Sequence, residues 1–218
     1  MTPEDRQRAQ GALRIWDRAS DVRGTAGEYY LAMRGLALPG ELDGEVVRFL
    51  PECPRQGGTC PALVVLFRRM EGDTPVAIQR IYITPDFKKL QQPMMLGPVA
   101  GAAMKLTSHR ATCCGAANFY APVLHVCEGF ETGLALLQLG YAPVWALGSA
   151  GAVERLPLLW FVGRVVVAFD NDESKAGERA AAAVKLTWGW RASAITTSAV
   201  GTDFADLVAA QAAEHADL

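Results

Sequence analysis

The second half of the chain alternates stretches of strand length with stretches of helical length. The segments expected to be strands are residues 123–127, 142–147, 164–169 and 191–197. The segments expected to be helices are residues 131–139, 152–159, 176–184 and 204–213. Pro157 is expected to break the second of them, and Ser174 to be the cap of the third. This alternation predicts an open parallel sheet covered by flanking helices, because right-handed crossovers leave almost no other topology.

The first 120 residues follow a less regular pattern. Helices are expected at residues 3–18 and 26–34, and strands of an antiparallel sheet at residues 46–50, 62–69 and 76–83. This mixture predicts a smaller α+β module. The small residues within 107–121, followed by Pro122, favour a joint between the two parts. We therefore predict two domains, residues 1–120 and residues 121–218.

Composition limits the class of protein. Half of the 218 residues are apolar and the formal net charge is −2, which excludes an intrinsically disordered chain. No apolar run approaches the roughly 18 residues that span a bilayer, and the opening residues do not resemble a secretory signal. An odd number of cysteines, five, favours free thiols in a reducing compartment over a disulfide framework. We therefore expect a cytoplasmic protein with no membrane contact.

Charge is unevenly distributed along the chain. Residues 1–120 carry 15 Lys and Arg against 12 Asp and Glu, whereas residues 121–218 carry 6 against 11. A basic part beside an acidic part suits a protein that holds a polyanion with one and divalent cations with the other. Two ordinary solvated surfaces would give the same asymmetry, so the motifs must decide.

Tryptophan can stack on nucleic-acid bases, and the chain has five. Trp145 and Trp160 lie in or beside the expected core elements, and Trp188 and Trp190 bracket the end of an expected helix. We therefore expect these side chains to pack in the interior rather than to contact a ligand.

Acidic residues follow three of the four predicted parallel strands. Glu128 comes after the first strand, Asp170 and Asp172 after the third, and Asp203 and Asp206 after the fourth. Ligands of an open parallel sheet bind at the carboxyl ends of its strands, so these side chains are expected to converge on one edge. Mutual repulsion would make such a cluster costly unless cations occupied it. Carboxylates with open water positions are the ligands that Mg²⁺ prefers.

Three motifs of this half, in order, resemble those of the Toprim domain, which bacterial-type DNA primases, topoisomerases and some nucleases share. They are Val-Cys-Glu-Gly-Phe-Glu-Thr at residues 126–132, Ala-Phe-Asp-Asn-Asp at 168–172 and Gly-Thr-Asp-Phe-Ala-Asp-Leu at 201–207. Four upstream segments are similar to the part that precedes the Toprim domain in primases of phages and mobile elements: residues 29–36, 61–64, 77–82 and 96–98. The resemblance favours a primase over a topoisomerase.

The resemblance implies a DNA primase core that makes short RNA primers on single-stranded DNA from nucleoside triphosphates. It implies that Glu128 is the general base or a metal-linked carboxylate near the attacking 3′-hydroxyl. It also implies that Asp170 and Asp172 hold Mg²⁺ or Mn²⁺, and that Asp203 or Asp206 completes the metal shell. Many primases carry an acid four residues after the first Glu, where this chain has Thr132. Glu131 either substitutes for that acid or faces solvent.

Anion-binding residues are also needed for such chemistry. The candidates for holding template phosphate or the incoming triphosphate are Arg80, Lys105, Arg34, Lys88 and Ser149. Arg80 and Lys105 rank first because they flank the stretch that is most similar to primases. Ser149 belongs to a Gly-Ser segment after the second strand. The backbone N–H groups of this segment could approach a phosphate, or the segment could be an ordinary turn.

Two features of primase systems are missing from the sequence: a zinc-binding domain with paired cysteines, and a Gly-x-x-x-x-Gly-Lys-Ser/Thr phosphate loop. A helicase or a zinc-binding, template-selecting domain is therefore expected to act in trans. Two alternatives stay open. The same acidic cluster could activate water in a metal-dependent nuclease, or the chain could be a non-catalytic Toprim protein that only binds nucleic acid or a partner.

Overall fold

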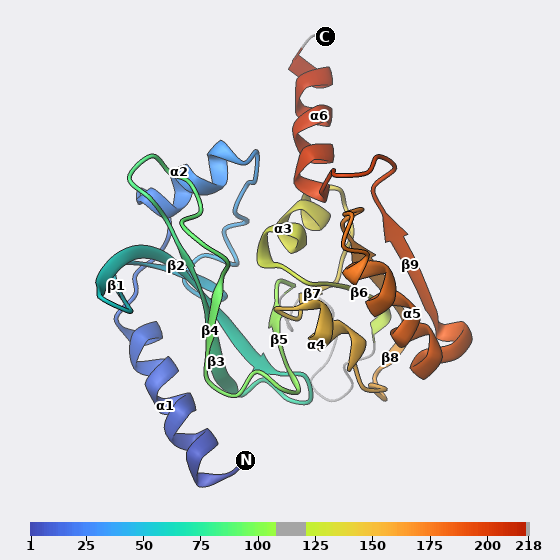
Figure 1. The fold of residues 1–218 in the computed structure, drawn as a ribbon, viewed down its shortest axis with the longest axis horizontal. Coiled ribbons are helices and arrows are strands. Elements are labelled where there is room, and N and C mark those ends of the chain that lie inside the picture. The colour runs from blue at the N-terminus through green and yellow to red at the C-terminus, as the bar shows by residue number, and fades with distance from the viewer. Residues whose placement is uncertain (108–120, 217–218) are drawn as a thin grey trace. The chain divides into compact units, whose positions relative to one another are not determined.

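The computed structural model describes residues 1–107 and 121–216. The chain divides into two compact units, Met1–Met104 and Lys105–Leu218 (Figure 1). The predicted joint at residues 107–121 lies almost entirely outside the described residues, so the boundary expected after residue 120 stays a prediction. In the described part of the chain, no helix combines the length and the apolar character needed to cross a membrane.

The first unit is the predicted α+β module. Its two helices are α1 (Pro3–Asp17) and α2 (Ala26–Met33). Its strands are β1 (Val47–Arg55), β2 (Gly58–Arg69), β3 (Pro75–Tyr82), β4 (Met94–Leu96) and β5 (Ala102–Lys105), the last of which ends at the unit boundary. Strand β2 pairs with β1, β3 and β5, and β3 pairs with β4, all antiparallel. The short strands β4 and β5 were not predicted, because three or four residues carry little periodicity.

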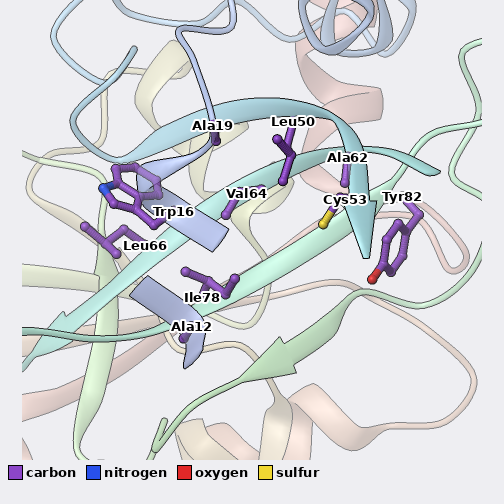
Figure 2. Close-up of a cluster of buried hydrophobic side chains, with 10 residues drawn as sticks. All are labelled: Ala12, Trp16, Ala19, Leu50, Cys53, Ala62, Val64, Leu66, Ile78 and Tyr82. Carbon is purple, nitrogen blue, oxygen red and sulfur yellow. The ribbon is translucent and has the colours of Figure 1, made fainter. Parts of the chain in front are cut away.

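Helix α1 closes one face of this sheet, as Figure 2 shows. Alternate residues of β2 point to the helix, which is the two-residue period of a strand. The buried cluster consists of Ala12, Trp16, Ala19, Leu50, Cys53, Ala62, Val64, Leu66, Ile78 and Tyr82. The Arg48 guanidinium lies 4.5 Å from the centroid of the Trp16 ring and donates a hydrogen bond to the Trp16 carbonyl, so a cation covers the indole.

The second unit contains a four-stranded parallel sheet in the order β7-β6-β8-β9. The strands are β6 (Ala121–Cys127), β7 (Val144–Ala146), β8 (Val162–Phe169) and β9 (Ala192–Thr196). The helices are α3 (Phe130–Gln138), α4 (Ala150–Glu154), α5 (Ala176–Trp188) and α6 (Phe204–Ala216), with the 3-10 turn η1 (Gly189–Arg191) before β9. This arrangement confirms the predicted open parallel sheet with flanking helices.

The order of the strands determines which helices cover which face of this sheet. The connection from β6 to β7 runs one way across the sheet and those from β7 to β8 and from β8 to β9 run the other way. Right-handed crossovers therefore place α3 on one face and α4 and α5 on the other. Helix α4 contacts α5, and α3 contacts α6 (Figure 1). The parallel strands then end together at one edge of the sheet.

Two local predictions in this unit were wrong. The helix expected at residues 152–159, with a break at Pro157, is α4, which begins at Ala150 and already ends at Glu154, because Pro157 cannot donate a helical hydrogen bond. The N-cap of α5 is Lys175, with φ 54°, and not Ser174. The Ser174 hydroxyl still accepts a hydrogen bond from the Ala176 N–H at 3.2 Å, which explains the serine.

Candidate active site

Four of the predicted acidic residues influence one another at the carboxyl edge of the parallel sheet. Glu128 directly follows β6, and Asp170 directly follows β8. The charges of Asp203, Glu128 and Asp172 all act on the Asp170 carboxyl. Chain order and sheet topology together therefore bring acids that are more than 70 positions apart in the sequence into one electrostatic cluster.

A small pocket of about 40 Å³ lies beside three of these acids. Glu128, Asp170 and Asp172 line it together with Thr132, and α5 closes one wall through Gly177. This volume holds a few water-sized groups at most. A larger hollow of about 460 Å³, also lined by Asp170 and Asp172, includes Lys175 and Val200. The site thus combines a small pocket, whose other lining residues are mostly apolar, with a larger open space beside Asp170 and Asp172.

Asp170 is the most perturbed carboxyl at this edge. Its Oδ1 atom is buried and accepts no hydrogen bond. Burial, followed by the charge of Asp203, raises the pKa of Asp170 to about 6, although the Phe204 N–H at the start of α6 donates a hydrogen bond that lowers it. A buried carboxylate oxygen without a partner costs free energy, and a divalent cation would remove that cost.

Glu128 is held at the start of α4. Its backbone carbonyl accepts a hydrogen bond from the Gly148 N–H at 2.7 Å, and its carboxylate accepts one from the Ala150 N–H. Burial nevertheless raises the pKa of Glu128, and the charge of Asp172 raises it further. A fixed carboxylate with an increased proton affinity is suited to accept a proton.

The Asp172 carboxylate orders the loop between β8 and α5. Its Oδ1 atom accepts hydrogen bonds from the Ser174 hydroxyl at 2.7 Å and from the Lys175 N–H at 3.0 Å. These bonds hold Asp172 on the wall of the small pocket. The local sequence Asp-Glu-Ser-Lys therefore fixes the direction of the second acid of the Asp-x-Asp motif.

Asp203 and Asp206 form a reciprocal capping box at the start of α6. The Asp203 N–H donates to Asp206 Oδ2 and the Asp206 N–H donates to Asp203 Oδ1, both at 2.9 Å. The motif Asp-Phe-Ala-Asp thus begins a helix that also donates a backbone N–H to Asp170.

The donor set fits a hard divalent cation. Carboxylate oxygens are the ligands of Mg²⁺ and Mn²⁺, and Asp170 offers a buried, unpartnered one. Within residues 1–107 and 121–216, no three His, Cys, Asp or Glu side chains are already placed to hold an ion. Mg²⁺ commonly takes one or two protein carboxylates, with water and substrate phosphates as its other ligands. Asp170 and Asp172 are the residues that would hold such an ion.

The structure separates Glu131 from its neighbour Thr132. Thr132 lines the pocket with Glu128, whereas the Glu131 side chain is buried and is not among the residues that line it. Successive helical residues differ by about 100° in direction, so only one of the two can face the pocket. Thr132 was not a predicted site residue. The spacing of four from Glu128, noted in the resemblance, is the signal that could have found it.

The two leading basic candidates are buried. Arg80 is 8% exposed, donates a hydrogen bond from Nη1 to the Pro54 carbonyl at 3.1 Å, and lies with its guanidinium 5.8 Å from the Tyr82 ring centroid. Lys105 is 4% exposed, and its Nζ lies 4.8 Å from the Trp145 ring centroid. Both cations therefore have packing partners, and their contact with template or nucleotide stays a prediction.

The other three candidates occupy varied surroundings. Lys88 is exposed and forms an ion pair with Asp86 at 3.0 Å, and Arg34 is half-buried. The Ser149 hydroxyl accepts a hydrogen bond from the Ala152 N–H at 3.2 Å, so it is the N-cap of α4. The sequence contained this capping signal, a serine just before a helix. Nucleotide binding by these residues also stays a prediction.

Gly177 allows α5 to approach β8 at the back of the pocket. A Cβ atom at this position would lie 2.5 Å from the Phe169 Cβ and 3.0 Å from its ring. Gly177→Ala is therefore expected to push α5 away and to lower the free energy of unfolding by about 1–3 kcal/mol, as overpacked cores do. Urea unfolding measures this loss. In the control Gly11→Ala, the nearest atom lies 3.9 Å away, so alanine should be neutral or stabilising in α1.

Comparison with protein families identifies the domain that carries this edge. Residues 123–214 match the family model of the Toprim domain. The second unit is a Toprim domain. Residues 6–106 match a second model, a domain of unknown function called DUF7146, which corresponds to the first unit. In the Toprim domain, Glu128 and the pair Asp170 and Asp172 occupy the ends of β6 and β8.

Solved structures show the same fold across both units. A DNA primase domain from Pseudomonas aeruginosa is 18% identical, with a TM-score of 0.62 over 95% of this chain and 77% of that chain. The Escherichia coli primase catalytic core is 15% identical, with a TM-score of 0.60 over 97% and 78%. The zinc-binding and RNA polymerase domains of the Aquifex aeolicus primase are 15% identical, with a TM-score of 0.60 over 98% of this chain and 60% of that chain. No curated protein matches the sequence. The chain therefore has the fold of primase catalytic cores.

Proposed function

We propose that this chain is a DNA primase core that joins ribonucleotides on a single-stranded DNA template with the help of Mg²⁺ or Mn²⁺. The observation that carries the proposal is Asp170, whose buried Oδ1 has no partner and whose carboxyl lies among Glu128, Asp172 and Asp203. A binding module has no evident need for such a costly cluster. The primase fold supports the same conclusion.

The proposed reaction forms a bond between the 3′-oxygen of the growing primer and the α-phosphorus of a nucleoside triphosphate, and pyrophosphate leaves. Glu128 takes the proton of the 3′-hydroxyl, because burial increases its proton affinity. Asp170 and Asp172 would hold the cation, and the hydrogen bonds from the Ser174 hydroxyl and the Lys175 N–H fix the Asp172 carboxylate for this role. When bound, the cation neutralises the charge that develops on the transferring phosphate.

The template and the partners belong to the same proposal. One solved relative is a DnaG primase catalytic domain bound to single-stranded DNA. Another contains the primase domains of bacteriophage T7 gp4 with a lagging-strand DNA polymerase. We infer that this chain, of phage or mobile-element type, takes a single-stranded DNA template in the cytoplasm. A helicase or a zinc-binding domain in trans would select the start site.

A nucleotide-incorporation assay tests the proposal. The full chain is incubated with circular single-stranded DNA, labelled nucleoside triphosphates and Mn²⁺ or Mg²⁺, and products are separated on a denaturing gel. We expect labelled oligonucleotides that require both the template and the cation. Loss of the DNA without nucleotides would support the nuclease alternative. Intact DNA without products, together with no Mn²⁺ binding by calorimetry, would leave only the binding role.

A further inference from the structure

The Toprim domain presents a second distinctive surface where β8 and β9 begin, at the end of the sheet opposite the acids. It is formed by residues 155–164, which lead into β8, and by residues 185–191, which end α5 and form η1 (Figure 1). We call these two segments the aromatic edge. The Trp188 Nε1–H donates to the Leu156 carbonyl at 3.4 Å, and Arg191 donates from Nε to the Gly163 carbonyl at 2.8 Å. The two segments are therefore in direct contact.

Large apolar side chains of the aromatic edge face solvent. Trp160 is 75% exposed and Trp190 is 77% exposed. Leu158 and Leu186 are also exposed. Trp188 packs in the interior, as predicted, but the prediction was wrong for Trp160 and Trp190. Trp160 lies in a loop and Trp190 in the 3-10 turn, so neither side chain is covered by the sheet or a helix.

Packing against a buried ring holds the Trp160 indole in place. Its ring makes an edge-on contact with Phe161, with centroids 5.4 Å apart and an interplanar angle of 89°. Phe161 is buried and lies 6.2 Å from the Trp145 ring in the core. The exposed ring is thus anchored at one side and open at the other. A rigid open indole binds a planar ligand without a large cost in side-chain entropy.

The charge of the aromatic edge is opposite to that of the rest of the domain. Four of the six Lys and Arg in residues 121–218 lie in its two segments: Arg155, Arg164, Lys185 and Arg191. The two segments contain no Asp or Glu, and all 11 acids of residues 121–218 lie outside them. Arg155, Arg164 and Lys185 are exposed. A cationic surface with open indoles thus stands at one end of an otherwise acidic domain.

We propose that the aromatic edge binds single-stranded nucleic acid. Bases would stack on Trp160 and Trp190, since every base has a π face, and the phosphates would lie against Arg155 and Arg164. Lys185 and Arg191 already donate to backbone carbonyls and would add to the positive charge of the surface. An apolar protein partner would suit the exposed indoles and leucines but would not require four cations without a single acid. This role needs no catalysis, so it stands or falls independently of the proposed function.

Tryptophan fluorescence tests the proposal directly. Trp16, Trp145 and Trp188 are buried, so the two exposed indoles should report on ligand. The full chain is titrated with oligothymidylate in EDTA, which suppresses cation-dependent binding at the acidic edge. We expect the oligonucleotide to quench the fluorescence of the native chain. Trp160→Leu and Trp190→Leu should each lower the affinity about tenfold, whereas Trp160→Phe should retain most of the native affinity. Equal binding by the Leu and Phe variants would overturn stacking, because leucine preserves the apolar surface only.

Salt dependence tests the cations. Arg164→Ala should reduce the slope of log affinity against log salt by about 0.7, the value for one phosphate contact on a single strand. Arg14→Ala, at another exposed arginine, on α1, is the matched control and should leave the slope unchanged. An unchanged slope in Arg164→Ala would contradict the proposal. A dimer that forms with increasing concentration in sedimentation, and that Trp160→Leu abolishes, would also contradict the proposal. The surface would then be an interface between two copies of the chain. Unaltered melting temperatures would show that both variants fold.

Discussion

Asp170→Asn is expected to lower the rate of cation-dependent nucleotide incorporation by at least about 100-fold, because it removes the charge that would hold the cation. Asn keeps the size of the side chain and can still accept the hydrogen bond from the Phe204 N–H. The loss should therefore come from the charge and not from an altered fold. Glu128→Gln should lower the rate by about 10²–10⁴-fold for a different reason, the loss of a proton acceptor.

The incorporation assay with purified variants measures both effects. Glu154→Gln is the matched control, since it removes one acid from the same domain that does not line the pocket. We expect this control to retain the native rate. Calorimetry with Mn²⁺ adds a second readout, in which Asp170→Asn should bind the cation much more weakly than the native chain. An Asp170→Asn variant with native incorporation would show that Asp170 is not a metal ligand.

The same substitution should have the opposite effect on stability. Without a cation, burial and the neighbouring acids raise the pKa of Asp170 from 3.8 to about 6. The folded state therefore binds more protons than the unfolded state between about pH 4 and pH 6, so stability is highest below this range and falls as the pH rises through it. Above pH 6, the ionised Asp170 destabilises the fold by about 2 kcal/mol, a value reduced for partial exposure.

Asp170→Asn removes this penalty. In EDTA at pH 7.5, we expect the variant to be about 2 kcal/mol more stable than the native chain in urea unfolding. At pH 4 the two proteins should have similar stability, because native Asp170 is then largely protonated. Glu128→Gln should shift stability in the same direction, since burial also raises the pKa of Glu128. The buried Asp170 Oδ1 has no hydrogen-bond partner in the folded chain. A variant less stable than the native chain at pH 7.5 would contradict this prediction, because the ionised carboxylate would then stabilise the fold.

The parallel sheet and the position of the acids could be predicted from residue order and hydrophobic pattern. The apolar stretch at residues 165–169 is typical of a strand in a covered parallel sheet, and it lies within β8. Glu128 and Asp170 follow strands of the same sheet, so right-handed connections bring them to one edge whatever the details of packing. Residue order and hydrophobic period suffice for conclusions of this kind.

The tertiary structure alone decided which side chains face the pocket, the core or the solvent. Thr132 and not Glu131 lines the pocket, because the rotation of α3 against the sheet depends on how the whole helix packs. Lys105 is buried over Trp145, whereas Trp160 is open to solvent, the reverse of what polarity predicts. Local sequence sets the period of a helix or strand, but the burial of one side chain depends on contacts with residues far away in the chain, and these exist only in the folded protein.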